Sequence, residues 1–206
     1  MTPKVIAIDG PAGSGKSTVA RAIAARLGLD YLDTGAMYRS VTLAVLDRDV
    51  DPSDGDAIAA MVGELAIEVG ERVTIDGADA TSAIRGPEVS ALVSVVAAHP
   101  EVRANLVARQ RRWVEARGGG VVEGRDIGTV VFPDAEVKVY LTASEAERVR
   151  RREAEAGADV AREVVRRDEI DSSRRVSPLL AADDALVIDT TGRAIEEIVE
   201  EVLSKL

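Results

Sequence analysis

Residues 10–18 have the types and the spacing needed to hold a chain of phosphates. The pattern G-x-x-x-x-G-K-[ST] is met by Gly10, Gly15, Lys16 and Ser17. Glycines let consecutive backbone N–H groups turn inward around a phosphate, and the positive end of the following helix points to the same place. Lys16 would then reach the β- and γ-phosphates, and the Ser17 hydroxyl would bind Mg²⁺. We therefore assign the whole stretch to nucleotide binding: Gly10, Pro11, Ala12, Gly13, Ser14, Gly15, Lys16, Ser17 and Thr18.

This loop needs a strand before it and a helix after it, and the sequence supplies both. An apolar run over 5–8 predicts a buried strand, and Val19, Ala20, Ile23, Ala24 and Leu27 recur at helical spacing. Gly28 can end that helix. Because both flanking elements are present, a glycine-rich turn that matches the pattern by chance is a poor explanation.

Further strands and helices alternate along the chain, which predicts a three-layer α/β/α fold around a parallel sheet. Short strands are expected to end at Asp33, before Glu123, at Leu141 and near Ile188. Ligands bind beyond the carboxyl ends of such strands. The polar residues that follow them, Asp33-Thr34 and 123–126 above all, are therefore expected to carry chemistry.

Two segments depart from the alternation. Apolar residues alternate with polar ones over 65–69 and 73–75, which predicts a small antiparallel sheet inserted into the α/β fold. The second segment, 148–175, is rich in arginine and poor in apolar residues. Ser144 and Glu147 predict a capping box at the start of its first helix.

Composition excludes several kinds of chemistry. The 206 residues contain no cysteine and one histidine, so thiolate metal sites and disulfides are excluded and imidazole catalysis is nearly so. A net charge of −10 and 2% aromatic residues disfavour nucleic-acid binding. With no signal peptide or apolar run of membrane-spanning length, we expect a cytoplasmic protein that acts on small molecules.

Three stretches together resemble bacterial cytidylate kinases over essentially the whole chain: 8–11 (Ile-Asp-Gly-Pro), 32–39 (Leu-Asp-Thr-Gly-Ala-Met-Tyr-Arg) and 124–133 (Gly-Arg-Asp-Ile-Gly-Thr-Val-Val-Phe-Pro). The resemblance implies transfer of the γ-phosphoryl of ATP to CMP or dCMP with Mg²⁺, by a monomer. It also implies a single kinase domain with a core (about 1–62, 99–142 and 176–206), an insertion that binds the nucleoside monophosphate (about 63–98) and an arginine-bearing helical lid (about 143–175).

The resemblance assigns roles to individual residues. Asp126, Arg103 and Ser94 would face the base, with Tyr38 against the ring and Thr34 also in the acceptor site. Arg39 and Arg125 would hold the acceptor phosphate, and Asp171 and Arg174 the ribose. Lys16 and the lid arginines Arg148, Arg151, Arg152 and Arg167 would stabilise the charge that moves between the phosphates, and Asp33 would hold a water bound to Mg²⁺.

The residue types suit this chemistry. A carboxylate such as Asp126 accepts a hydrogen bond from the N4 amino group of cytosine and repels O4 of uracil. The attacking phosphate oxygen is already anionic, so positioning and charge neutralisation suffice without a general base. Plainer explanations stay open at this point: Asp126 as a structural loop residue, Ser94 as a surface serine, Asp33 as a helix-entry residue, Arg39 and Arg125 as members of surface salt bridges, and each lid arginine as part of a solvated face.

Three other functions fit the sequence less well. A P-loop GTPase should carry an N-K-x-D motif, which is missing, and Asp189-Thr190-Thr191-Gly192 mimics its D-x-x-G motif too late in the chain. A kinase of another acceptor, such as UMP, AMP or shikimate, fits Asp126 and Arg103 less well. A nucleotide-binding regulator without turnover would not need Lys16 and both phosphate-binding arginines.

Overall fold

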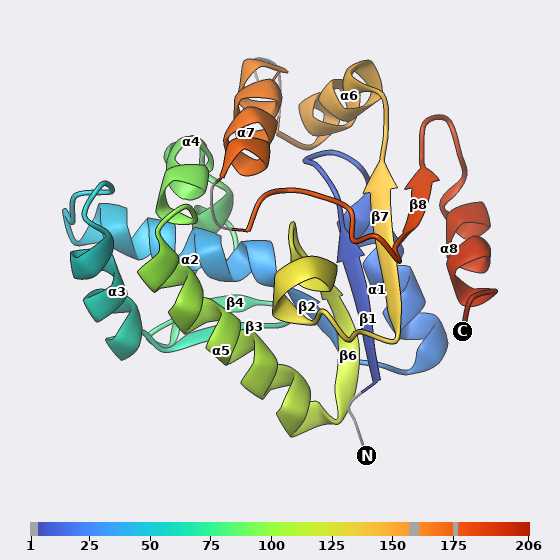
Figure 1. The fold of residues 1–206 in the computed structure, drawn as a ribbon. Coiled ribbons are helices and arrows are strands. Elements are labelled where there is room, and N and C mark those ends of the chain that lie inside the picture. Colours follow the sequence, from blue (N-terminus) through green and yellow to red (C-terminus); the bar gives the residue numbers. More distant parts are fainter. Residues whose placement is uncertain (1–3, 157–160, 175–176) are drawn as a thin grey trace. The chain divides into compact units, whose positions relative to one another are not determined.

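The computed structural model describes residues 4–156, 161–174 and 177–206, with side chains outside 155–165 and 167. The chain divides into two compact units, Met1–Leu32 with Trp113–Leu206, and Asp33–Arg112. Each unit is described by itself (Figure 1). The first unit carries the parallel sheet and the phosphate loop.

A five-stranded sheet in the order β2-β6-β1-β7-β8 forms the centre of the first unit. Its strands are β1 (Lys4–Asp9), β2 (Tyr31–Asp33), β6 (Gly119–Glu123), β7 (Val137–Thr142) and β8 (Leu186–Asp189). β1 lies between β6 and β7 in parallel register, so that Ile6 is level with Val121 and Val137. β8 pairs in parallel with β7. The predicted parallel sheet is confirmed.

Within the first unit, helical elements lie on both faces of this sheet (Figure 1). α1 (Lys16–Leu27) and α8 (Ile195–Leu203) pack their apolar sides on one face, in a core that includes Ile8, Ile23 and Ile198. The π-helical turn η2 (Ile127–Val131) lies on the other face. A Cβ at Gly128 would lie 3.2 Å from the side chain of Lys138, which alternates with the core residues of β7 and so points away from α1.

Two polar helices follow β7, namely α6 (Glu145–Ala156) and α7 (Ala161–Ser173). The Ser144 hydroxyl accepts a hydrogen bond from the N–H of Glu147 at 3.3 Å, as a capping box requires. The Glu147 carboxylate, however, binds Arg150 and Arg151 at 2.7 and 2.8 Å. The Ser144 N–H, which would complete the capping box, donates instead to the Thr191 hydroxyl at 2.9 Å, so only half of the predicted capping box forms.

The second unit joins helices to a small antiparallel sheet, as predicted. Its elements are α2 (Thr34–Asp47), α3 (Gly55–Glu64), β3 (Ile67–Val69), β4 (Val73–Ile75), β5 (Ala78–Asp79), η1 (Ala83–Arg85), α4 (Pro87–Val96) and the first part of α5 (Pro100–Arg117). β4 pairs with both neighbours, and the two-residue β5 is a strand that the sequence did not predict. Ala36, Val73, Ala80 and Ile84 form a small core of their own.

Candidate active site

The phosphate loop joins β1 to α1 and depends on its glycines. Gly10, Gly13 and Gly15 have φ values of 144°, 75° and 88°, in the region that favours glycine. A Cβ at Gly10 would lie 2.0 Å from the Leu141 carbonyl oxygen, and one at Gly13 would lie 2.6 Å from that of Arg148. No side chain caps the first turn of α1, so its N–H groups stay open to an anion. The loop therefore has the geometry that the sequence pattern predicts.

Lys16 lies folded back over this loop. Its Nζ donates a hydrogen bond to the Pro11 carbonyl oxygen at 2.7 Å. Burial lowers the pKa of the Lys16 ammonium, and the like charge of Arg125 acts in the same direction. A phosphate bound in the loop would oppose both effects, because an anion favours the charged ammonium. Lys16 is thus placed to bind an anion.

Ser17 and Glu123 put hard oxygen donors next to each other at the ends of α1 and β6. The Ser17 hydroxyl donates to the Glu123 carboxylate at 2.7 and 3.0 Å, and the Tyr31 hydroxyl also donates to Glu123. Hydroxyl and carboxylate oxygens are the ligands that Mg²⁺ prefers. Ser17 was the predicted metal ligand, whereas Glu123 was predicted from its place at the end of a buried strand only to carry chemistry, without a role at the metal.

Asp33, the other residue expected near the metal, belongs to the second unit and begins α2. Its carboxylate accepts a hydrogen bond from the N–H of Ala36 at 2.9 Å, and it lies 3.9 Å from Arg85. This is the ordinary contact of an N-cap aspartate. The helix-entry interpretation therefore holds for Asp33, and its part in metal binding stays a prediction.

The residues expected around the acceptor's sugar and phosphate in the first unit do gather. The Arg125 guanidinium binds the Asp171 carboxylate at 2.8 Å and donates to the Gly10 carbonyl oxygen at 2.5 Å. Arg174 pairs with the same carboxylate, whose side chain is 2% exposed. Asp126, also buried, begins η2 directly after Arg125. The contact with Gly10 places this group beside the phosphate loop.

Asp9, the last residue of β1, had no predicted role beyond its place in a motif, yet it is a buried polar residue at the centre of the site. Its two carboxylate oxygens accept hydrogen bonds from the N–H groups of Ile127 and Gly128 at 2.8 and 2.7 Å. Burial raises the pKa of Asp9 to about 6, and the charge of Asp126 adds to the rise. The two backbone N–H groups and Lys16 oppose that shift.

The raised pKa of Asp9 predicts a pH-dependent stability. Because the folded state holds this proton more tightly than the unfolded chain, the stabilising contribution is complete below pH 3.8 and is lost as the pH rises through about 6. From pH 4 to pH 7 the wild type should lose about 2 kcal/mol relative to Asp9→Asn, which cannot titrate. Urea unfolding of both proteins at the two pH values measures this difference. An equal change in both proteins would contradict the raised pKa.

Among the expected acceptor residues of the second unit, Arg103 and Tyr38 lie next to each other. The Arg103 guanidinium lies 5.4 Å from the centre of the Tyr38 ring and donates to the Ala97 carbonyl oxygen. Arg39 donates to the Ser90 hydroxyl at 3.1 Å. Thr34 and Ser94 are buried, with 3% and 2% exposure. The surface-serine interpretation of Ser94 is therefore wrong.

The lid arginines differ in what they contact. Arg148 pairs with Asp168 of α7 and donates to the Ala12 carbonyl oxygen at 3.3 Å, so it does lie against the phosphate loop. Arg152 is half-buried. Arg167 lies outside the side chains that the structure describes.

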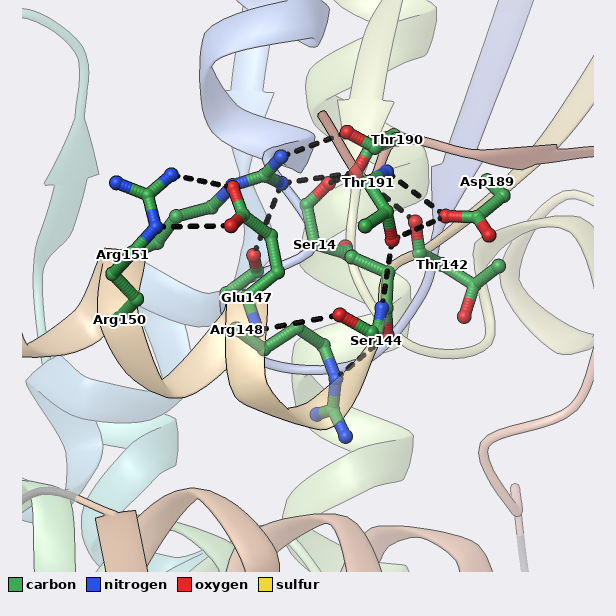
Figure 2. Close-up of polar contacts among 12 residues, drawn as sticks. Ser14, Thr142, Ser144, Glu147, Arg148, Arg150, Arg151, Asp189, Thr190 and Thr191 are labelled. Carbon is green, nitrogen blue, oxygen red and sulfur yellow. Dashed lines mark hydrogen bonds and ion pairs between the residues drawn. The ribbon is translucent and has the colours of Figure 1, made fainter. Parts of the chain in front are cut away.

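Arg151 has a different environment, which Figure 2 shows. Its guanidinium binds the Glu147 carboxylate and both oxygens of Thr190, at 2.8 to 2.9 Å. The Thr190 hydroxyl in turn lies 3.0 Å from the carbonyl oxygens of Ser14 and Thr142. Thr190 thus ties α6, the end of β7 and the phosphate loop together. The sequence placed Thr190 only in a fragment that mimics a GTPase motif.

The sheet order and the phosphate loop after its first strand define a P-loop kinase fold. The structure is similar to that of a gluconokinase from Sinorhizobium meliloti 1021, with a TM-score of 0.56 and 16% identity over 99% of this chain and 91% of that one. It is also similar to the shikimate kinase of Acinetobacter baumannii, with a TM-score of 0.50 and 14% identity over 98% and 92% of the two chains. At these identities the likeness establishes the fold alone.

Sequence comparison gives the family. The family model for cytidylate kinase matches residues 6–206. The cytidylate kinase of Desulfitobacterium hafniense is 52% identical over 97% of this chain and 90% of its own length, and that of Mycobacterium leprae is 50% identical over 98% and 95%. The chain therefore belongs to the cytidylate kinase family.

Some relatives are longer. A bifunctional pantoate ligase/cytidylate kinase from Prochlorococcus marinus is 50% identical over 97% of this chain, which spans 44% of that protein. Across four such bifunctional relatives the chain spans 42–44% of their length. In the described part of the chain, no helix is both long and apolar enough to cross a membrane.

Proposed function

We propose that the protein transfers the γ-phosphoryl group of ATP to CMP or dCMP, giving CDP or dCDP and ADP. The proposal is supported most directly by the contact between Arg125 and Gly10, because it puts a guanidinium, a group suited to binding phosphate, beside the phosphate loop. Asp171 and Arg174 belong to the same cluster. An acceptor phosphate held there would lie next to the donor phosphates.

In the proposed reaction an oxygen of the CMP phosphate attacks the γ-phosphorus, and the bond from that phosphorus to the bridging oxygen of ADP breaks. Arg125 and Arg39 hold the acceptor phosphate, since guanidinium groups bind phosphate oxygens in pairs. Lys16 stabilises the charge that moves between the phosphates. We assign the same role to Arg148, Arg152 and Arg167.

Selection of the base is assigned to Asp126, which would accept a hydrogen bond from N4 of cytosine. Ser94 and Arg103 would meet the remaining base edge, and Tyr38 the ring. Asp171 and Arg174 would bind the ribose. Thr34 completes the acceptor site.

Ser17 and Glu123 would hold Mg²⁺, because together they offer the oxygen donors that this ion prefers. The bound ion would neutralise charge on the β- and γ-phosphates. Asp33 would bind a water of its coordination shell. For the full protein, a monomeric state, a cytoplasmic location, no binding of nucleic acid, and the division into core, acceptor-binding insertion and lid stay predictions.

A panel of acceptors tests the proposed function. ADP release with CMP, dCMP, UMP and AMP is measured in a coupled assay at saturating ATP and Mg²⁺. We expect CMP and dCMP to be used with a kcat/KM more than about tenfold above that for UMP, since a buried carboxylate facing uracil O4 is left without a donor. AMP should be inactive. A preference for UMP or AMP would contradict the proposal.

A further inference from the structure

The end of β1 and the first residue of the phosphate loop bind the loop after β6 through four hydrogen bonds. The N–H of Gly124 donates to the Ile8 carbonyl oxygen at 2.9 Å, and Arg125 donates to that of Gly10. The carboxylate oxygens of Asp9 accept the other two, from Ile127 and Gly128. Three consecutive residues of β1 and the phosphate loop therefore set the course of the segment that carries Arg125 and Asp126.

Of these four contacts, the two made by Asp9 require an aspartate side chain. Each of its two oxygens accepts from a separate backbone N–H, and the residue is 5% exposed. Asparagine has one acceptor oxygen, so it would leave one buried N–H facing an amide group that also donates. Among side chains of this length, aspartate alone offers a separate acceptor oxygen to each of the two N–H groups.

The two N–H groups belong to the residues directly after Asp126. The Asp126 carbonyl oxygen begins the π-helical turn by accepting from Val130 at 2.9 Å and from Val131 at 3.2 Å. A backbone held on both sides of one residue leaves that residue little freedom, so the direction of the Asp126 side chain follows from the contacts of Asp9. On the other side Asp9 is joined to Gly10, which packs too closely against Leu141 to shift.

We propose that Asp9 is a positioning residue for the acceptor: it fixes Asp126 relative to the phosphate loop and so sets the affinity and selectivity for cytosine nucleotides. The proposal rests on the proposed function, because it takes Asp126 as the group that meets the base. It assigns Asp9 no contact with either substrate. A purely structural Asp9 would change stability without separating the two substrates.

Asp9→Asn tests the proposal, with affinities for CMP and for a non-hydrolysable ATP analogue measured by calorimetry and KM values measured alongside. Loss of one hydrogen bond to a charged group, with a donor left unpaired, should weaken CMP binding by about tenfold to a hundredfold. Affinity for the ATP analogue should change less than about threefold, because the phosphate loop keeps its own contacts. The ratio of kcat/KM for CMP over UMP should fall as well.

Ile198→Val is the matched control. It lowers stability through the sheet core that also holds Ile8, without touching the loop after β6. It should leave both affinities unchanged. Unchanged CMP affinity in Asp9→Asn, or equal weakening for CMP and the ATP analogue, would overturn the proposal. If Asp9→Asn does not fold, Asp9→Glu takes its place in the test. Glutamate keeps the charge and both acceptor oxygens, but its longer side chain displaces the loop. CMP affinity should therefore fall while affinity for the ATP analogue is retained. Wild type that binds no CMP would instead refute the proposed function.

Discussion

Lys16→Ala is expected to lower kcat by about a thousandfold, since removing one preorganised donor to transition-state charge costs a factor of about 10² to 10³. Lys16 brings an ammonium group, whose pKa burial lowers to about 7, to the first turn of α1, where the open N–H groups of the helix already favour an anion. The alanine keeps the helix, because alanine is a strong helix former. Single-turnover kinetics with CMP measure the loss.

The control for this prediction is Lys4→Ala, which removes an exposed ion pair with Glu136 in the same unit. Its kcat should match that of the wild type, because exposed ion pairs contribute little. Affinity for CMP should survive in Lys16→Ala, which separates lost catalysis from lost folding. Near-normal turnover in Lys16→Ala would mean that the transition-state charge is stabilised elsewhere.

The parts of this fold that could be predicted from sequence are those governed by local rules. Glycines at 10, 13 and 15 adopt positive φ values for reasons that the pattern itself contains. Hydrophobic periodicity gave the strands and helices of the parallel sheet, and alternation gave the antiparallel pair β3 and β4. Because strand ends carry ligands in such sheets, Asp126 and Arg125 could also be picked out.

The parts that escaped prediction depend on side chains that bond to a distant backbone. Asp9 meets Ile127 and Gly128 across more than 100 residues, and Thr190 meets the carbonyl of Ser14 across 176. Neither residue belongs to a local pattern that signals such a partner. The capping box at Ser144 forms only in part, since the Ser144 N–H donates to the distant Thr191 hydroxyl and Glu147 binds Arg150 and Arg151. A sequence pattern shows which residues can form a hydrogen bond, but not which of several possible partners each residue binds in the folded protein.

Asp126→Ala is expected to lower kcat/KM for CMP by about a hundredfold while leaving affinity for ATP unchanged. The loss has two sources: the hydrogen bond from N4 disappears, and the amino group of the bound base is left without an acceptor. UMP gains from the change, because the carboxylate that repelled its O4 is gone. The ratio of kcat/KM for CMP to kcat/KM for UMP should therefore fall by a larger factor than kcat/KM for CMP does.

Asp126→Asn sharpens the same test, because its amide can either accept from N4 of cytosine or donate to O4 of uracil. The side chain keeps its size, so the π-helical turn after it should be retained and thermal stability should stay close to that of the wild type. We expect UMP use to rise above the wild-type value in this variant while CMP use falls. If both variants keep the wild-type ratio, base selection does not reside at Asp126, and the buried carboxylate serves the loop alone.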